Sequence, residues 1–211
     1  MSDSPAFSDA AQMWNRRYRE AGDALLFGAE PNDWLRRQAH RLVPGGHWLS
    51  VADGEGRNSV WLARQGLRVD AFDIAEQGVA KARALAAAQG VQVDYAVADG
   101  DALRWPEGQY DGIVAIFIQF ADPAMRARLF ARMARALRSG GLLLLQGYTP
   151  RQLEYRTGGP ARADHLYTEV LLRDAFAALE ILELSEYEDV LAEGSGHQGR
   201  SALIGMVARR P

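Results

Sequence analysis

The chain has 211 residues and a formal net charge of −3, with 48% hydrophobic and 24% charged residues. This composition is typical of a single globular domain, residues 1–211, and lacks the basic surface needed to bind nucleic acid or an acidic membrane. The absence of cysteine excludes disulfides, thiolate metal sites and cysteine nucleophiles. No apolar run approaches the roughly 20 residues that span a bilayer, and residues 1–10 do not resemble a signal peptide. We therefore expect a cytoplasmic protein.

The predicted elements begin with two helices over about residues 8–19 and 32–42. Alternating strands and helices follow. Strands are expected over residues 47–51, 67–73, 91–97, 110–117, 142–146, 181–187 and 202–208. Helices are expected over residues 57–65, 76–89, 123–137 and 168–179. Strands separated by helices predict a mostly parallel α/β sheet with helices on both faces.

The last two predicted strands differ from the others because no helix separates them. Residues 188–201 are polar and rich in glycine, with no helical pattern. A parallel connection needs a helix-sized crossover, so we expect an antiparallel pair here. Residues 1–46 are expected to form a helical cap on the sheet domain of residues 47–211.

The strongest functional signal follows the first strand. Gly54 and Gly56 precede a helix, where they allow a ligand to approach the backbone and the free N–H groups of the helix start. Asp73 ends the next strand, 19 residues after Gly54 (73 − 54 = 19), and a carboxylate there can accept two ribose hydroxyls. The pattern indicates a nucleoside site. Its predicted residues are Ala52, Asp53, Gly54, Gly56, Arg57, Asn58, Asp73, Ile74, Asp99 and Gly100.

Several features disfavour a nicotinamide dinucleotide. Ser59 occupies the position of the third glycine in the G-x-G-x-x-G pattern. Asp99 follows the third strand and supplies a second carboxylate, which can reach an adenine amino group. The only lysine is Lys81, so the chain has no Tyr-x-x-x-Lys proton-transfer pair. The antiparallel end of the sheet also fits a dehydrogenase poorly.

The chain resembles the class I S-adenosylmethionine (SAM) dependent methyltransferases over about residues 14–209. It is most similar to the small bacterial tellurite-resistance and thiopurine-methyltransferase-like group. The resemblance is carried by Trp14, Arg17-Tyr18, Phe27-Gly28, Pro31-Asn32, Gly54-Glu55-Gly56-Arg57-Asn58, Asp73, Asp99, Tyr110-Asp111 and Leu137-Arg138-Ser139-Gly140-Gly141.

The resemblance implies a seven-stranded Rossmann-like sheet of order 3-2-1-4-5-7-6, with strand 7 antiparallel. It also implies SAM as cofactor and S-adenosylhomocysteine (SAH) as product. Two positions depart from the family pattern, since Ser50 and Ala52 stand where the family usually has an acid and a glycine. The loss of the acid weakens contact with the methionine end of SAM unless Asp53 compensates.

Residues outside the glycine loop are candidates for catalysis and for enclosing the substrate. Arg57 is a cation at a helix start, which implies an anionic partner. His197 and Tyr148 are candidates to accept a proton from an oxygen or nitrogen nucleophile, and Glu193 can pair with His197. The candidates for binding or covering the substrate are Trp14, Tyr18, Phe27, Gln119, Phe120, Arg156 and Glu193.

These residues predict transfer of a methyl group from SAM to a small-molecule nucleophile. A soft thiol or a chalcogen oxyanion is favoured because such nucleophiles need little or no general base. One alternative is a non-catalytic protein that binds SAM or a nucleoside, and a second, disfavoured one is a nicotinamide-dependent oxidoreductase. The histidine spacing predicts no metal site, and both a monomer and a homodimer remain open.

Overall fold

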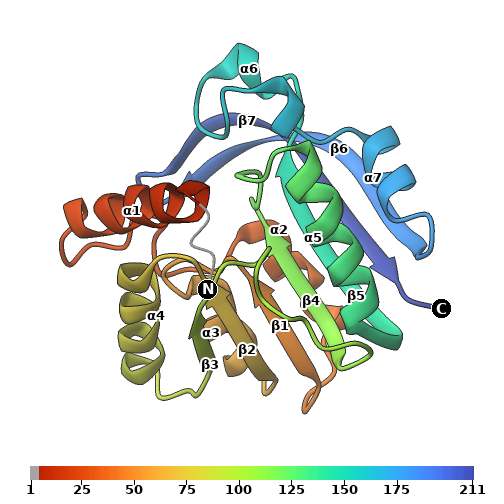
Figure 1. The fold of residues 1–211 in the computed structure, drawn as a ribbon, viewed down its shortest axis with the longest axis horizontal. Coiled ribbons are helices and arrows are strands. Elements are labelled where there is room, and N and C mark those ends of the chain that lie inside the picture. Colours follow the sequence, from red (N-terminus) through yellow and green to blue (C-terminus); the bar gives the residue numbers. More distant parts are fainter. Residues whose placement is uncertain (1–4) are drawn as a thin grey trace.

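The structure is a computed structural model that describes residues 5–211. Its centre is a seven-stranded sheet of order β3-β2-β1-β4-β5-β7-β6 (Figure 1). The strands are β1 (His47–Val51), β2 (Arg68–Asp73), β3 (Asp94–Val97), β4 (Tyr110–Ile116), β5 (Leu137–Tyr148), β6 (Glu180–Glu193) and β7 (His197–Arg209). The predicted fold class and strand order are confirmed.

Helices lie on both faces of the sheet, with α5 and α7 in front and α2 and α3 behind in Figure 1. The α-helices are α1 (Pro5–Glu20), α2 (Asp33–Arg37), α3 (Arg57–Arg64), α4 (Glu76–Ala88), α5 (Pro123–Ala136), α6 (Gln152–Tyr155) and α7 (Glu169–Ala175). Two short 3₁₀ helices are η1 (Gln38–Arg41) and η2 (Ala163–His165). None of the helices in residues 5–211 is long and apolar enough to cross a membrane.

The sheet is parallel from β3 to β5, and β7 then pairs antiparallel with both β5 and β6. The two last strands are much longer than predicted, because residues 188–201 extend both strands and turn only at 194–196. Residues 188–201 have the polar composition of a loop because β6 is an edge strand whose outer side chains face solvent. Acidic side chains of β6 pair with arginines, as in Glu188–Arg200 and Glu180–Arg209.

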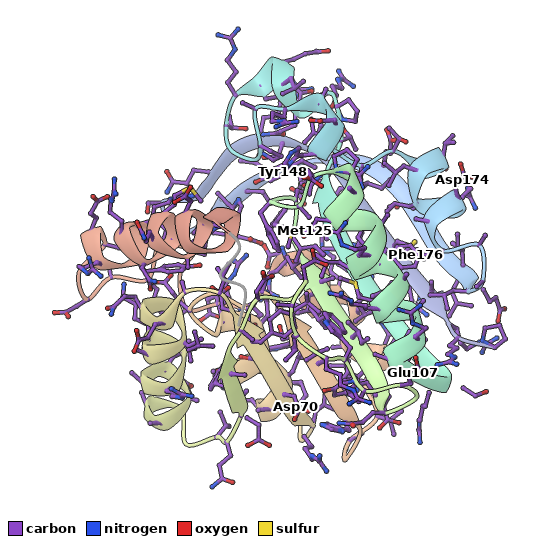
Figure 2. All side chains as sticks on the ribbon, viewed as in Figure 1. Asp70, Glu107, Met125, Tyr148, Asp174 and Phe176 are labelled. Carbon is purple, nitrogen blue, oxygen red and sulfur yellow. The ribbon has the colours of Figure 1, made fainter. Side chains whose placement is uncertain are left out.

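The parallel strands bring their carboxyl ends to one edge of the sheet. Figure 2 shows Tyr148, the last residue of β5, at the upper edge and Asp70 and Glu107 at the lower edge. Above the upper edge, β6 and β7 arch toward α1, which packs against α4 (Figure 1). The N-terminal segment, residues 5–46, therefore reaches the edge at which open α/β sheets bind ligands.

Strands β4 and β1 pack tightly at Gly112 of β4, which faces the indole of Trp48 in β1. A Cβ at residue 112 would overlap that ring, which is 2% exposed and enclosed by the core behind the sheet. We expect Gly112→Ala to lower the free energy of unfolding by about 3 kcal/mol, the upper end for overpacked cores.

Urea unfolding measures this loss, and Gly90→Ala is the matched control. Gly90 has open space around it and a φ of 65°, so alanine there costs only about 1 kcal/mol of backbone strain. Equal losses in the two variants would show that the contact with Trp48 is unimportant.

Candidate active site

The loop between β1 and α3, residues 52–56, has an unusual backbone, and we call it the glycine loop. Ala52, Gly54 and Gly56 have φ values of 49°, 62° and 90°, so three of its five residues are left-handed. At Gly56 a side chain would strike Ala82 of α4 and the Tyr95 hydroxyl, so glycine is needed for close packing as well as for φ. The loop runs along the carboxyl edge of the sheet, as the sequence predicts.

Asp73 connects this loop to the end of β2. Its Oδ2 accepts a hydrogen bond from the Gly54 N–H at 2.9 Å, and its Oδ1 accepts one from the Ala75 N–H at 2.8 Å. Burial raises the pKa of Asp73, and these backbone donors oppose the rise. A carboxylate has about four acceptor positions, so two remain for a ligand after the loop has been fixed.

Half-exposed side chains follow β2 and β3 at the same edge. Ile74 comes directly after Asp73, and Asp99 comes two residues after β3. One oxygen of Asp99 accepts the Asp101 N–H at 2.8 Å. A side chain on Gly100 would press on the Phe72 ring and Leu129, so glycine lets this turn lie against the core.

Five aromatic rings form a continuous row beside the loop, which we call the aromatic row. Neighbouring ring centroids are 6.3, 4.7, 4.4 and 4.7 Å apart. The row links α1 to the carboxyl ends of β4 and β5 through the start of β7. In order, its members are Trp14, Phe27, His197, Phe117 and Tyr148.

His197 and Tyr148 also share a hydrogen bond of 2.6 Å between the ring Nδ1 and the hydroxyl. Burial, together with the positive charges of Arg57 and Arg17, lowers the pKa of His197 to about 3. Burial raises the pKa of Tyr148 well above its ordinary value, and Glu193 adds to the rise. At neutral pH both side chains are therefore uncharged.

A buried ion pair joins α3 to the β6–β7 turn. Arg57 donates from Nη2 to Glu193 Oε2 at 2.7 Å, and both side chains are less than one-tenth exposed. Glu193 Oε1 accepts from Asn32 Nδ2 at 2.9 Å and from the Asp33 N–H at 3.2 Å. Arg57 also donates to the Phe27 carbonyl at 3.2 Å. We call this the Glu193 cluster; it joins α3, the hairpin and the N-terminal segment.

The comparisons with known proteins agree with this geometry. Residues 49–141 match the family profile described as a methyltransferase domain. An uncharacterized protein of Mycobacterium tuberculosis is 30% identical over 131 residues, which cover 57% of this chain and 47% of that protein. The chain spans about half the length of the first curated relatives that it matches. Demethylmenaquinone methyltransferase of Thermus thermophilus is 30% identical over 138 residues, 64% of this chain and 62% of that enzyme.

Among solved structures, TehB from Haemophilus influenzae superposes with a TM-score of 0.71 at 20% identity, covering 94% of this chain and 67% of that one. The family match thus identifies residues 49–141 as a methyltransferase domain. The family match and the resemblance of the sequence both imply SAM as the cofactor of such a domain and SAH as its product. The finer resemblance to the tellurite-resistance and thiopurine group is not established by these comparisons.

The residues of the methyltransferase domain fit this cofactor. The Asp73 carboxylate has acceptor positions beyond its two backbone contacts that could hold ribose hydroxyls, and the half-exposed Ile74 and Asp99 flank the same edge. The described side chains include no cluster of three or more acidic or histidine residues that could hold a metal ion.

Several predicted substrate residues have structural contacts. The Gln119 amide accepts the Tyr148 N–H and donates to the carbonyls of Tyr148 and His165, so it joins β4 to β5. Phe120 is 43% exposed and Arg156 is exposed. The expected pair between Glu193 and His197 is wrong: they lie opposite one another in the β6–β7 ladder, but their side chains bond to Arg57 and Tyr148.

Of the N-terminal aromatic residues, Tyr18 reaches the glycine loop. Tyr18 is 3% exposed, and its hydroxyl lies where a side chain on Gly54 would be. Sequence reasoning gave Asn32 no site role, although its place before a helix is a cap signal, and α2 is indeed capped by Asn32. It also missed Phe117, whose φ of 55° has no signal in the sequence.

We expect Glu193→Gln to destabilise the folded protein by about 3 kcal/mol, because it leaves the buried Arg57 guanidinium without a counter-charge. Urea unfolding measures the loss, and hydrogen exchange of residues 24–33 should show faster opening of the N-terminal segment.

The control for this prediction is Glu188→Gln in the same hairpin. Glu188 pairs with Arg151 and Arg200, but these partners are mostly exposed, and exposed pairs add little stability. If the two variants unfold alike, the Glu193 cluster is no stronger than a surface ion pair.

Proposed function

We propose that this chain transfers a methyl group from SAM to a small-molecule nucleophile. The observation that carries the proposal is the Asp73 carboxylate, which holds the Gly54 backbone within a matched methyltransferase domain. SAM supplies a methyl group on a sulfonium sulfur, which a nucleophile attacks in line. The protein must align the two groups and exclude water.

We assign the cofactor side of the site to the glycine loop and to the ends of β2 and β3. Asp73 would accept the ribose hydroxyls, Asp99 the adenine amino group, and Ile74 would contact the adenine face. The N-terminal segment would act as a cap, since Tyr18 already lies against Gly54 of the loop and Phe27 is part of the aromatic row. Such a cap excludes water from the sulfonium and the nucleophile.

The acceptor side favours a soft nucleophile. His197, with a pKa of about 3, is too weak a base to deprotonate an alcohol or amine at neutral pH. Tyr148 is a neutral phenol whose proton is held more tightly than usual. Thiols ionise near neutral pH and chalcogen oxyanions carry their own charge, so neither requires a base. This agrees with the resemblance of the sequence to the tellurite-resistance and thiopurine group.

We expect the protein to bind SAH with a dissociation constant in the micromolar range, about −8 kcal/mol, and not to bind NADH. Asp73→Ala should weaken binding about 100-fold or more, because charge-assisted hydrogen bonds contribute roughly 1.5–3 kcal/mol each. Isothermal titration calorimetry measures both quantities.

Asp70→Ala is the matched control on the same strand. Asp70 accepts a hydrogen bond from the Tyr110 hydroxyl at 2.9 Å, away from the glycine loop, so SAH affinity should not change. Binding of NADH without SAH would instead support an oxidoreductase. SAH binding without transfer to any acceptor tested would support a non-catalytic SAM-binding protein.

A panel of thiols, selenite, tellurite, phenols and amines tests the acceptor class. We expect transfer to thiols and chalcogen oxyanions, with a kcat/KM for thiols that rises with pH along the ionisation of the thiol itself. His197→Gln should keep the shape of this pH profile, because the imidazole is already neutral throughout. A profile that follows a group with a pKa near 6.5 and disappears in His197→Gln would restore the histidine as a general base.

A further inference from the structure

The Asp53 carboxylate in the glycine loop has several hydrogen bonds within the protein. Asp53 Oδ1 accepts hydrogen bonds from Ser50 Oγ at 2.6 Å and from the Ser59 N–H at 3.3 Å. Its Oδ2 accepts the Ser59 hydroxyl. The Tyr95 hydroxyl lies 2.9 Å from the same Ser59 Oγ. The Asp53 carboxylate thus connects the end of β1, the first turn of α3 and, through Ser59, strand β3.

These contacts stabilise a backbone that is costly to form. Ala52 is a non-glycine residue in the left-handed region, which costs about 1 kcal/mol or more, and the glycines on either side of Glu55 have many other conformations in the unfolded chain. The N-cap residue Gly56 has no side chain to accept the free N–H groups of α3. Asp53 supplies that acceptor at Ser59, so the loop depends on it for its shape.

The carboxylate has no counter-charge. Among the ion pairs of residues 9–211, none involves Asp53; the nearby cations Arg57 and Lys81 pair with Glu193 and Glu55. Loss of hydration raises the pKa of Asp53 to about 6, although the serine donors oppose the rise. A carboxyl group whose pKa is raised on folding stabilises the fold only while it stays protonated, so at neutral pH its charge lowers stability.

We propose that Asp53 is a positioning residue for SAM: through its hydrogen bonds to Ser50 and Ser59 it holds residues 52–56 in the shape that receives the cofactor. The inference rests on the proposed function. Three of the about four acceptor positions of the Asp53 carboxylate are taken by protein donors, so we assign Asp53 a role through the shape of the loop. A group that costs stability and yet organises a binding loop is expected to serve binding.

The first test compares Asp53→Asn and Ser59→Ala with the wild type by SAH titration and thermal melting at pH 7.5. Both variants should bind SAH about tenfold or more weakly. Asp53→Asn should melt at the same temperature as the wild type or higher, because it removes an uncompensated charge. A purely structural residue would lose stability along with affinity.

Asp111→Asn is the control for removing a carboxylate that joins two strands. Asp111 accepts the His47 N–H at 2.7 Å and pairs with Arg138 at the opposite edge of the sheet. We expect this variant to melt at a lower temperature while it binds SAH as the wild type does.

The second test is the pH dependence of SAH binding. Other ionisable groups that interact with Asp53 are Asp73 at the end of β2, Tyr95 of β3 and Tyr18 of α1. If binding requires the Asp53 carboxylate, affinity falls as pH drops through about 6, by about tenfold between pH 7.5 and pH 5. The affinity of Asp53→Asn should change much less over this range.

Each outcome separates the inference from the proposed function. A wild-type protein that binds no SAH contradicts the proposed function itself. Wild-type binding with unchanged affinity in Asp53→Asn, or in Ser59→Ala, overturns the positioning role alone. Equal pH dependence in the wild type and Asp53→Asn would assign the titration to another group and also overturn it.

Discussion

The buried carboxylate of Glu193 brings together three segments that are far apart in the sequence. A carboxylate with so little contact with water is tolerated only when its hydrogen-bonding positions are filled and its charge is matched. Arg57 supplies the charge, and Asn32 and the Asp33 N–H supply further donors. The N-terminal segment, the helix after the glycine loop and the β6–β7 turn must therefore come together for any one of them to be stable. This requirement produces the closed arrangement over the sheet edge.

The Glu193 cluster also connects the glycine loop with the aromatic row. Glu193 and His197 are partners in the β6–β7 ladder, so the turn that carries the ion pair also carries the central ring of the aromatic row. Burial lowers the pKa of His197, and the positive charges of Arg57 and Arg17 lower it further. The surface that we propose for the methyl acceptor is therefore uncharged and aromatic. Such a surface suits alignment and exclusion of water better than proton transfer.

The backbone of the glycine loop is held by the hydrogen bonds of two carboxylates, Asp53 and Asp73. Burial raises the pKa of both Asp53 and Asp73, and the charge of Asp73 adds to the rise at Asp53. Asp73 turns to the backbone of residues 54 and 75, whereas Asp53 turns to two serines. The left-handed Ala52, the first residue of the loop, is a further local cost at the same place.

The sequence by itself determined the sheet, its antiparallel end and the loop with Asp73, because these depend on periodicity, on connection length and on glycine spacing within short windows. It misjudged residues 188–201, since the polar outer face of an edge strand has the composition of a loop. Only the tertiary structure decided that Glu193 pairs with Arg57 and that His197 bonds to Tyr148. Those partners lie 136 and 49 residues apart, and burial selects among many possible charge pairs only once the chain has folded.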